Sequence, residues 1–151
     1  MKKIILATVS FLTMLMVNAQ DVEGIKIGQS KQKDKIVSIK GNTYQVMPVE
    51  SDDSELCLGV MIMPVNNDTL VPTTLNKTQV DQFQSSMEEE FDVAFDSVLV
   101  YDEATMMFAK NKGVEYEINI EKSDDQYDAF FVIWYKELEE NLKASTSVVH
   151  P

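Results

Sequence analysis

The sequence contains no arginine and only one histidine, and the first absence bears on nucleic-acid binding. All 13 basic residues are lysines, and they stand against 25 acidic residues, so the net charge is −12. Arginine supplies the planar fork that grips phosphates and reads guanine, and an acidic chain repels the phosphate backbone. We therefore expect no nucleic acid among the partners.

The lone histidine is His150, next to the C-terminal Pro151, where order is lowest in most domains. A Ser-His-Asp triad or a multi-histidine metal site needs an imidazole held firmly in the fold. The single cysteine, Cys57, cannot form an intramolecular disulfide, and its leucine neighbours indicate a buried thiol that acts as a small hydrophobe. These features exclude most common hydrolase and metalloenzyme designs, and no cofactor is predicted.

Only one long hydrophobic run is present, from Ile4 to Val17, and it follows a positive start at Met1-Lys2-Lys3. At 14 residues the run is short for a membrane span, which needs about 20. Small residues at Val17 and Ala19 match the positions that a signal peptidase reads. The sequence thus predicts a bacterial signal peptide over residues 1–19, cleaved before Gln20. The remaining residues 20–151 would form a single globular domain, periplasmic or secreted, with no stable membrane span.

The periodicity of large apolar residues predicts one long amphipathic helix over Thr78–Phe95, with Thr78 as its cap and Asp81 in its first turn. The residues of its apolar stripe recur three or four apart: Val80, Phe83, Met87, Phe91 and Phe95. Such a stripe must be buried against another layer. Residues 137–143, with Leu138 and Leu142 four apart, predict two further helical turns.

Before this helix, two β-prone runs (residues 35–40 and 43–48) flank Gly41-Asn42 and predict a hairpin. Pro48 indicates that the second run ends there or forms an edge. The run from Leu56 to Val65 is apolar at almost every position and predicts a strand buried on both faces.

After the helix, four strand-like runs follow one another with short turns: residues 97–101, 105–110, 114–121 and 127–136. Short connections favour an antiparallel meander. The sequence therefore predicts an α+β fold in which one helix packs on a curved, mainly antiparallel sheet.

Methionine and aromatic side chains are the best candidates for a binding site. An apolar pocket between helix and sheet would be lined by Met61, Met63, Phe83, Met87, Phe91 and Trp134. Adaptable methionine-rich surfaces suit apolar ligands, although such residues more often fill a core.

Acidic turns offer weak candidates for calcium, the best being Asp124, Asp125 and Asp128. Their spacing does not match a calcium loop with alternating ligands and a glycine turn, and aspartate favours turns for local reasons. No metal site is therefore predicted.

No catalytic motif is present, so we expect a non-enzymatic binding or interaction module that contacts a protein partner or an apolar small molecule. Two alternatives stay open. One is a small hydrolase or isomerase that uses carboxylates, which requires a carboxylate with a raised pKa in a cleft. The other is a structural component of an envelope assembly.

Overall fold

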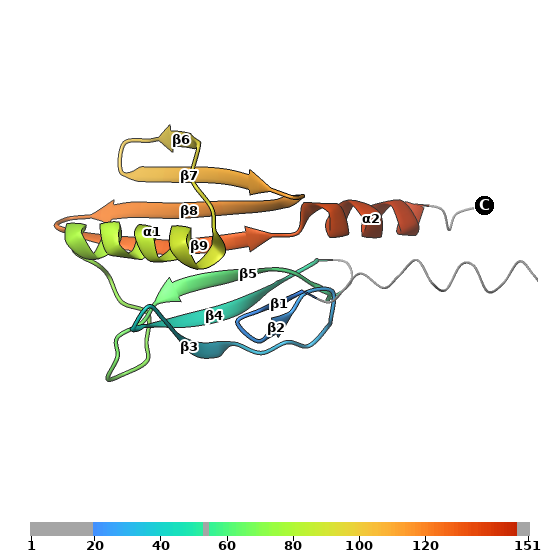
Figure 1. Ribbon diagram of the computed structural model, residues 1–151, viewed down its shortest axis with the longest axis horizontal. Coiled ribbons are helices and arrows are strands. Elements are labelled where there is room, and N and C mark those ends of the chain that lie inside the picture. The colour runs from blue at the N-terminus through green and yellow to red at the C-terminus, as the bar shows by residue number, and fades with distance from the viewer. Residues whose placement is uncertain (1–19, 53–54, 148–151) are drawn as a thin grey trace, which may run out of the picture.

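The computed structural model describes residues 20–52 and 55–147 (Figure 1). Seven strands make the main sheet: β3 (Lys35–Ile39), β4 (Asn42–Glu50), β5 (Cys57–Pro64), β6 (Ser97–Val100), β7 (Ala104–Asn111), β8 (Val114–Ser123) and β9 (Gln126–Trp134). The sheet is antiparallel throughout, with strand order β3-β4-β5-β9-β8-β7-β6. A two-stranded sheet of β1 (Asp21–Val22) and β2 (Ile25–Lys26) and two helices, α1 (Lys77–Phe91) and α2 (Lys136–Ser147), complete the described fold. The predicted α+β class with an antiparallel sheet is confirmed. The predicted signal peptide, residues 1–19, lies outside the described residues.

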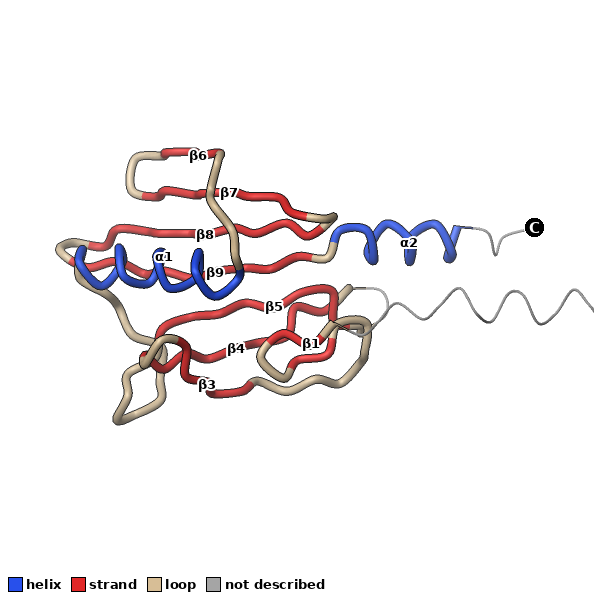
Figure 2. The backbone as a smooth tube through the Cα atoms, viewed as in Figure 1, coloured by secondary structure: helices blue, strands red, loops and turns tan. Residues whose placement is uncertain are grey.

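The chain builds this sheet in two parts that meet in its middle. The first part runs from β3 through β4 to β5, and the chain then leaves the sheet as α1 (Figure 2). It returns at the far edge as β6, and the meander β6-β7-β8-β9 brings it back to pair with β5. Four-strand pairing after the helix is what the spacing of the turns predicts.

Helix α1 begins and ends earlier than the sequence predicts. Its N-cap is Asn76, whose side chain accepts a hydrogen bond from the Gln79 backbone N–H while the Gln79 side chain binds back to the Asn76 N–H. This reciprocal capping box satisfies two backbone donors, so the predicted cap at Thr78 is wrong. The helix ends at Phe91 because Asp92 adopts the left-handed conformation at φ 50°. Phe95 is therefore in the loop that leads to β6.

The stripe of α1 forms the centre of the core. Phe83 is 2% exposed and Met87 fully buried, and both belong to one cluster with Phe131 of β9. The Phe83 ring packs on Tyr44 of β4 with centroids 5.8 Å apart, and Phe91 stacks on Phe131 at 5.2 Å. The predicted stripe is thus buried against the middle strands of the sheet.

The short β1–β2 hairpin packs on the same face of the sheet as α1. Val22, Ile25 and Ile27 are buried in the cluster that contains the helix stripe. Glu23 at the hairpin turn lies close enough to Glu90 of α1 for their charges to interact. Helix and hairpin therefore cover one face of the sheet together.

The hairpin β3–β4 turns one residue earlier than predicted. Lys40 and Gly41 occupy the turn with φ of 51° and 84°, and Ile39 pairs with Asn42, which already belongs to β4. Positive φ at both turn residues is the pattern of a type I′ turn, which matches the twist of the two strands.

Pro48 does not end β4, which corrects one of the two predicted alternatives, but the pairing of β4 with β3 does not reach it. It pairs with Val60 of β5 inside the strand. The Val65 N–H donates to Thr43 O, so odd-numbered residues of β4 direct their N–H groups towards β5 and even-numbered ones towards β3. Pairing with β3 stops at Val46, so no bond is lost at Pro48.

Strand β5 is buried on both faces only over its first four residues, Cys57–Val60, whereas the sequence predicts burial on both faces throughout. Val60 and Ile62 are fully buried, but the intervening Met61 and Met63 stay half-exposed. A run of apolar residues does not by itself show whether a second layer covers the strand.

The C-terminal helix α2 is longer than the two predicted turns and extends beyond the end of the sheet (Figure 1). Leu138 packs against the core cluster, and α2 follows directly from β9. Among the described residues, no helix has the length and apolarity needed to cross a membrane.

Phe83 offers a direct test of the core. Phe83→Ala removes a buried ring that packs on Tyr44, so we expect the free energy of unfolding to fall by about 3–5 kcal/mol. Urea unfolding followed by circular dichroism measures this loss. Ser85→Ala, at an exposed position on the same helix, is the matched control and should change stability by less than about 0.5 kcal/mol. A Phe83 variant as stable as the control would contradict the packing described.

Candidate functional site

The face of the main sheet that lies away from α1 is lined by apolar side chains, and we call it the open face. Because successive residues of a strand point to opposite faces, the neighbours of the helix-facing Phe131 belong to it. On the strands between the two edge strands, its large apolar residues are Met47, Val49, Met61, Met63, Met106, Phe108, Phe130, Val132 and Trp134, whereas β8 contributes Glu115, Glu117, Asn119 and Glu121. All nine are half-exposed, whereas the residues that alternate with them on β5 and β9 are buried.

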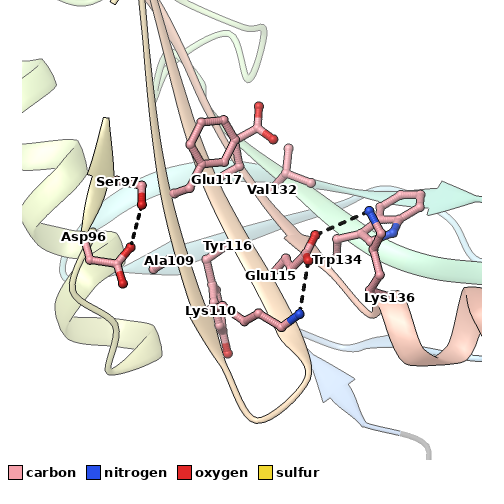
Figure 3. Close-up of a pocket in the computed structure, with 11 residues that line it drawn as sticks. Asp96, Ser97, Ala109, Lys110, Glu115, Tyr116, Glu117, Val132, Trp134 and Lys136 are labelled. Atoms are coloured by element: carbon pink, nitrogen blue, oxygen red, sulfur yellow. Dashed lines mark hydrogen bonds and ion pairs between the residues drawn. The ribbon is translucent and has the colours of Figure 1, made fainter. Parts of the chain in front are cut away.

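A hollow of about 550 Å³ opens on this face, over β7, β8 and β9 (Figure 3). Its apolar part comes from Phe108, Val132 and Trp134. Trp134 pairs across from Gly59, and a Cβ at Gly59 would lie 3.2 Å from the indole atom Cε3. The glycine therefore leaves room for the indole to lie against β5.

Charged side chains surround the apolar part of the hollow. Glu115 lies between two lysines, with Lys110 Nζ 3.4 Å from one carboxylate oxygen and Lys136 Nζ 3.6 Å from the other (Figure 3). Glu117 and Asp96 add further carboxylates to the lining. Glu117 lies between Phe108 of β7 and Val132 of β9, so the hollow presents apolar and charged side chains next to one another.

The first turn of α2 fixes the indole of Trp134. The indole N–H donates to Glu139 Oε2 at 3.0 Å, and Lys143 Nζ bonds the other carboxylate oxygen. The bond from Lys143, reinforced by the one from Trp134, holds the pKa of Glu139 below its ordinary value.

The structure divides the six predicted pocket residues between opposite faces of the sheet. Phe83, Met87 and Phe91 lie on α1 and pack in the core. Met61, Met63 and Trp134 lie on the open face, and only Trp134 lines the hollow. The six do not line one cavity, because α1 packs directly on the other face of the sheet.

Sequence reasoning missed Phe108, Lys110, Glu115 and Lys136 as neighbours of Trp134. Alternation along residues 114–121 shows that Glu115 and Glu117 lie on the same face of their strand. Alternation along residues 127–136 shows the same for Val132 and Trp134. Only the pairing register, with Glu115 across from Trp134 and Glu117 across from Val132, reveals that both pairs lie on the same face of the sheet.

Other candidate groups lie away from the hollow. Partial burial raises the pKa of Glu23, and the charges of Glu90 and Asp21 add to this, but Glu23 is in the β1–β2 turn. Burial raises the pKa of the Cys57 thiol, which donates to Gly59 O at 3.1 Å. A buried thiol of raised pKa is a poor nucleophile.

The three predicted calcium candidates lie at the β8–β9 turn. Asp124 and Asp125 form the turn itself, and Asp128 pairs across from Glu121. All three are exposed. Within residues 20–52 and 55–147, no group of three or more His, Cys, Asp or Glu side chains is placed to hold a metal ion.

A comparison of the chain with protein-family models, with curated proteins and with solved structures gives no match. Function must therefore be argued from the site alone.

Trp134 is the only tryptophan, so its fluorescence reports on the contact with Glu139. A lowered pKa means that the ionised form persists below the ordinary glutamate value and is lost only as the pH falls further. We expect the emission to change with a midpoint below the ordinary pKa of a glutamate. Circular dichroism over the same range separates this step from unfolding.

Two variants make that titration specific. Glu139→Gln should abolish the step, because the amide does not titrate, whereas Glu140→Gln, exposed on the same helix, should leave it unchanged. An unaltered step in the Glu139 variant would show that another group controls the indole.

Proposed function

We propose that this chain is an exported, non-enzymatic binding module that docks a protein partner on its open face. The observation that supports the proposal is the sheet surface with nine half-exposed apolar side chains, next to which the charged residues of β8 lie. Apolar side chains that stay accessible together on one face are often functional.

The apolar residues of the open face lie mainly on three adjacent strands. They extend from β4 through β5 to β9, which is two inter-strand spacings or about 10 Å. Along β9 they run from Phe130 to Trp134, or about 14 Å at the usual rise per residue. Met106 and Phe108 of β7 lie beyond β8, whose residues on this face are polar or charged. The hollow would receive a large side chain of the partner as an anchor.

An apolar small molecule is the second form of the same proposal. The hollow falls within the usual range for ligand sites, about 300–1,000 Å³. It is open to solvent along the sheet, however, and drug-sized ligands are usually enclosed over most of their surface. The protein form of the proposal is therefore favoured.

The carboxylate-enzyme alternative is less well supported. It requires a carboxylate of raised pKa in a cleft, and the raised group Glu23 does not line the hollow. Glu115, which does line it, is paired with two lysines.

A substitution at the centre of the open face tests the proposal. Val132→Lys puts a charge beside Trp134 and should weaken partner binding by at least about tenfold, because it leaves a charge at the centre of the interface. The tagged chain is mixed with envelope extract of its host, and retained species are identified by native mass spectrometry. Ser85→Lys, exposed on α1 at the other face, is the control and should retain the partner. Equal retention by both variants, or none by the unmodified chain, would contradict docking on this face.

The intact mass of the chain from its host tests the export part of the proposal. Removal of residues 1–19 takes away Lys2 and Lys3, leaving 11 lysines against 25 acidic residues and a net charge of −14. We expect the mass of a chain that begins at Gln20. A chain that still begins at Met1 would contradict cleavage.

A further inference from the structure

The two edges of the main sheet have opposite charge, and neither is closed by another described strand. Strand β6 ends the sheet on one side and β3 on the other (Figure 1). The β6 edge is apolar, with Val98 55%, Leu99 48% and Val100 73% exposed, and acidic residues flank it at Asp96, Asp102 and Glu103. Exposed apolar edge strands are templates for strand addition, and proteins usually blunt them with lysine or proline.

The β3 edge is basic. Four of the chain's 13 lysines lie within ten residues of the sequence: Lys31, Lys33, Lys35 and Lys40. The Lys35 ammonium bonds the Gly24 carbonyl, and Lys40 pairs with Glu89 at 3.5 Å in an exposed contact, which is worth little energy. Ile36, in the middle of this edge, is 45% exposed.

The register shows which backbone groups each edge offers. Tyr101 N–H donates to Ala104 O, so the alternation of an antiparallel pair directs the N–H and C=O groups of Val98 and Val100 away from β7. The two-residue turn at Lys40-Gly41 makes Ile39 and Asn42 a bonded pair, and the groups of Ile36 and Ser38 therefore point away from β4. Each edge offers two residues to a further strand.

These two edges fit each other when a second copy lies beside the first in the same orientation. A wholly antiparallel sheet of seven strands has edge strands that point the same way, so β3 of one copy would lie parallel to β6 of the next. In a parallel pair, a residue bonds the two neighbours of the residue opposite it, so Ile36 would bond to Val98 and Val100 and lie opposite Leu99. Ile36 and Leu99 both belong to the open face, and the faces of the two copies remain continuous.

The same register matches charge at both ends of the added pair. It places Lys33 opposite Asp96 and Lys40 opposite Glu103, with the apolar pairs of Ile36 with Leu99 and Val37 with Val100 between them. If β3 slid along β6, it would have to move by two residues so that the faces of the two copies stay aligned. A shift of two residues in either direction leaves an acidic residue at one end of β6 without a lysine opposite it.

Pairing of β6 with a second β6 is disfavoured by the same reasoning. In the twofold arrangement that bonds Val98 to Val100, Asp96 of each copy is directly opposite Asp102 of the other. Like charges directly opposite one another across strands are destabilising.

We propose that the chain associates with a second copy head to tail, β3 of one copy adding as a parallel strand to β6 of the next. The contact uses two different surfaces, so it leaves a free β6 and a free β3 at the ends and can repeat. The contact includes Asp96, which also lines the hollow, but it does not involve Trp134 or Val132, whose substitution tests the proposed partner binding.

Charge reversal with complementation tests the proposal. Sedimentation velocity of the purified chain in 0.15 M salt, from about 1 µM to about 1 mM, should show a mass that grows with concentration. Lys33→Glu and Asp96→Lys should each weaken association by about three- to tenfold, because each replaces an attraction by a repulsion. An equimolar mixture of the two variants should restore the unmodified behaviour. In the mixture the glutamate introduced on β3 of one variant meets the lysine introduced beside β6 of the other, and the reciprocal contact joins the native Lys33 to the native Asp96.

A backbone variant tests strand addition itself. Val100→Pro removes an N–H that points away from β7 and would donate to Ile36 O of the added strand, so the β6–β7 pairing stays intact while the added strand loses a bond. Association should fall by at least about tenfold, whereas Val100→Thr, which keeps the N–H, should leave it unchanged. Circular dichroism shows whether both variants fold. If the proline variant does not fold, the mixture of the two charge variants is the test of the proposed association.

Three results would overturn the proposal. One is a monomer at every concentration, and another is failure of the mixed charge variants to associate. The third is a dimer that is lost in the Val100→Pro variant but indifferent to Lys33→Glu, because that behaviour belongs to β6–β6 pairing. A Val132→Lys variant that loses its partner but associates normally would separate this inference from the docking proposal.

Discussion

The packing of α1 on one face of the main sheet is the constraint from which the rest of the surface follows. The helix runs along the strands and is about 10–12 Å wide, whereas seven strands at the usual spacing span about 29 Å (Figure 1). One such helix covers the middle of one face, and the β1–β2 hairpin fills the space beside its C-terminal end. No described element of comparable size covers the other face. The methionines and aromatic residues of the open face are half-exposed because the described helix and hairpin cover only the opposite face of the sheet.

The same topology determines what the edges are. After α1 the chain returns to the sheet at the side farthest from β3. The first strand that it forms there, β6, is therefore one edge of the sheet, and β3 is the other. Most sheets protect such edges with charge or irregularity. Here the lysines near β3 protect one edge, while β6 has only acidic residues at its two ends and four exposed residues between them.

The local sequence pattern was sufficient to predict the helices and strands, but it was insufficient to predict which side chains share a face of the sheet. The 3.6-residue period of Val80, Phe83 and Met87 correctly predicts a helix with a buried stripe, because helix geometry is a local property. The period does not specify the cap, since Asn76 competes with Thr78 and prevails by a reciprocal bond to Gln79. The four-strand meander is equally predictable from its short turns.

The site could not be predicted in the same way, since it depends on register between strands far apart in the sequence. Met61 belongs beside Val132, and Glu115 beside Trp134, only because β5 and β8 both pair with β9. An apolar run such as residues 56–65 is compatible with one or two covering layers, and the number of layers is decided by how much helix the whole chain supplies. The predicted pocket therefore combined residues of a true core with residues of a true surface.

An uncovered face and an uncovered edge have a joint physical consequence. Parallel addition of β3 to β6 would keep the open faces of successive copies on one side, so each added copy would present another docking surface in line with the first. A partner with two matching segments would then bind the second segment at a high effective concentration and gain affinity without any new contact. Antiparallel addition would turn alternate copies over and separate their open faces. The direction in which the edge strands point therefore decides whether weak docking on a single copy can become tight binding on an array.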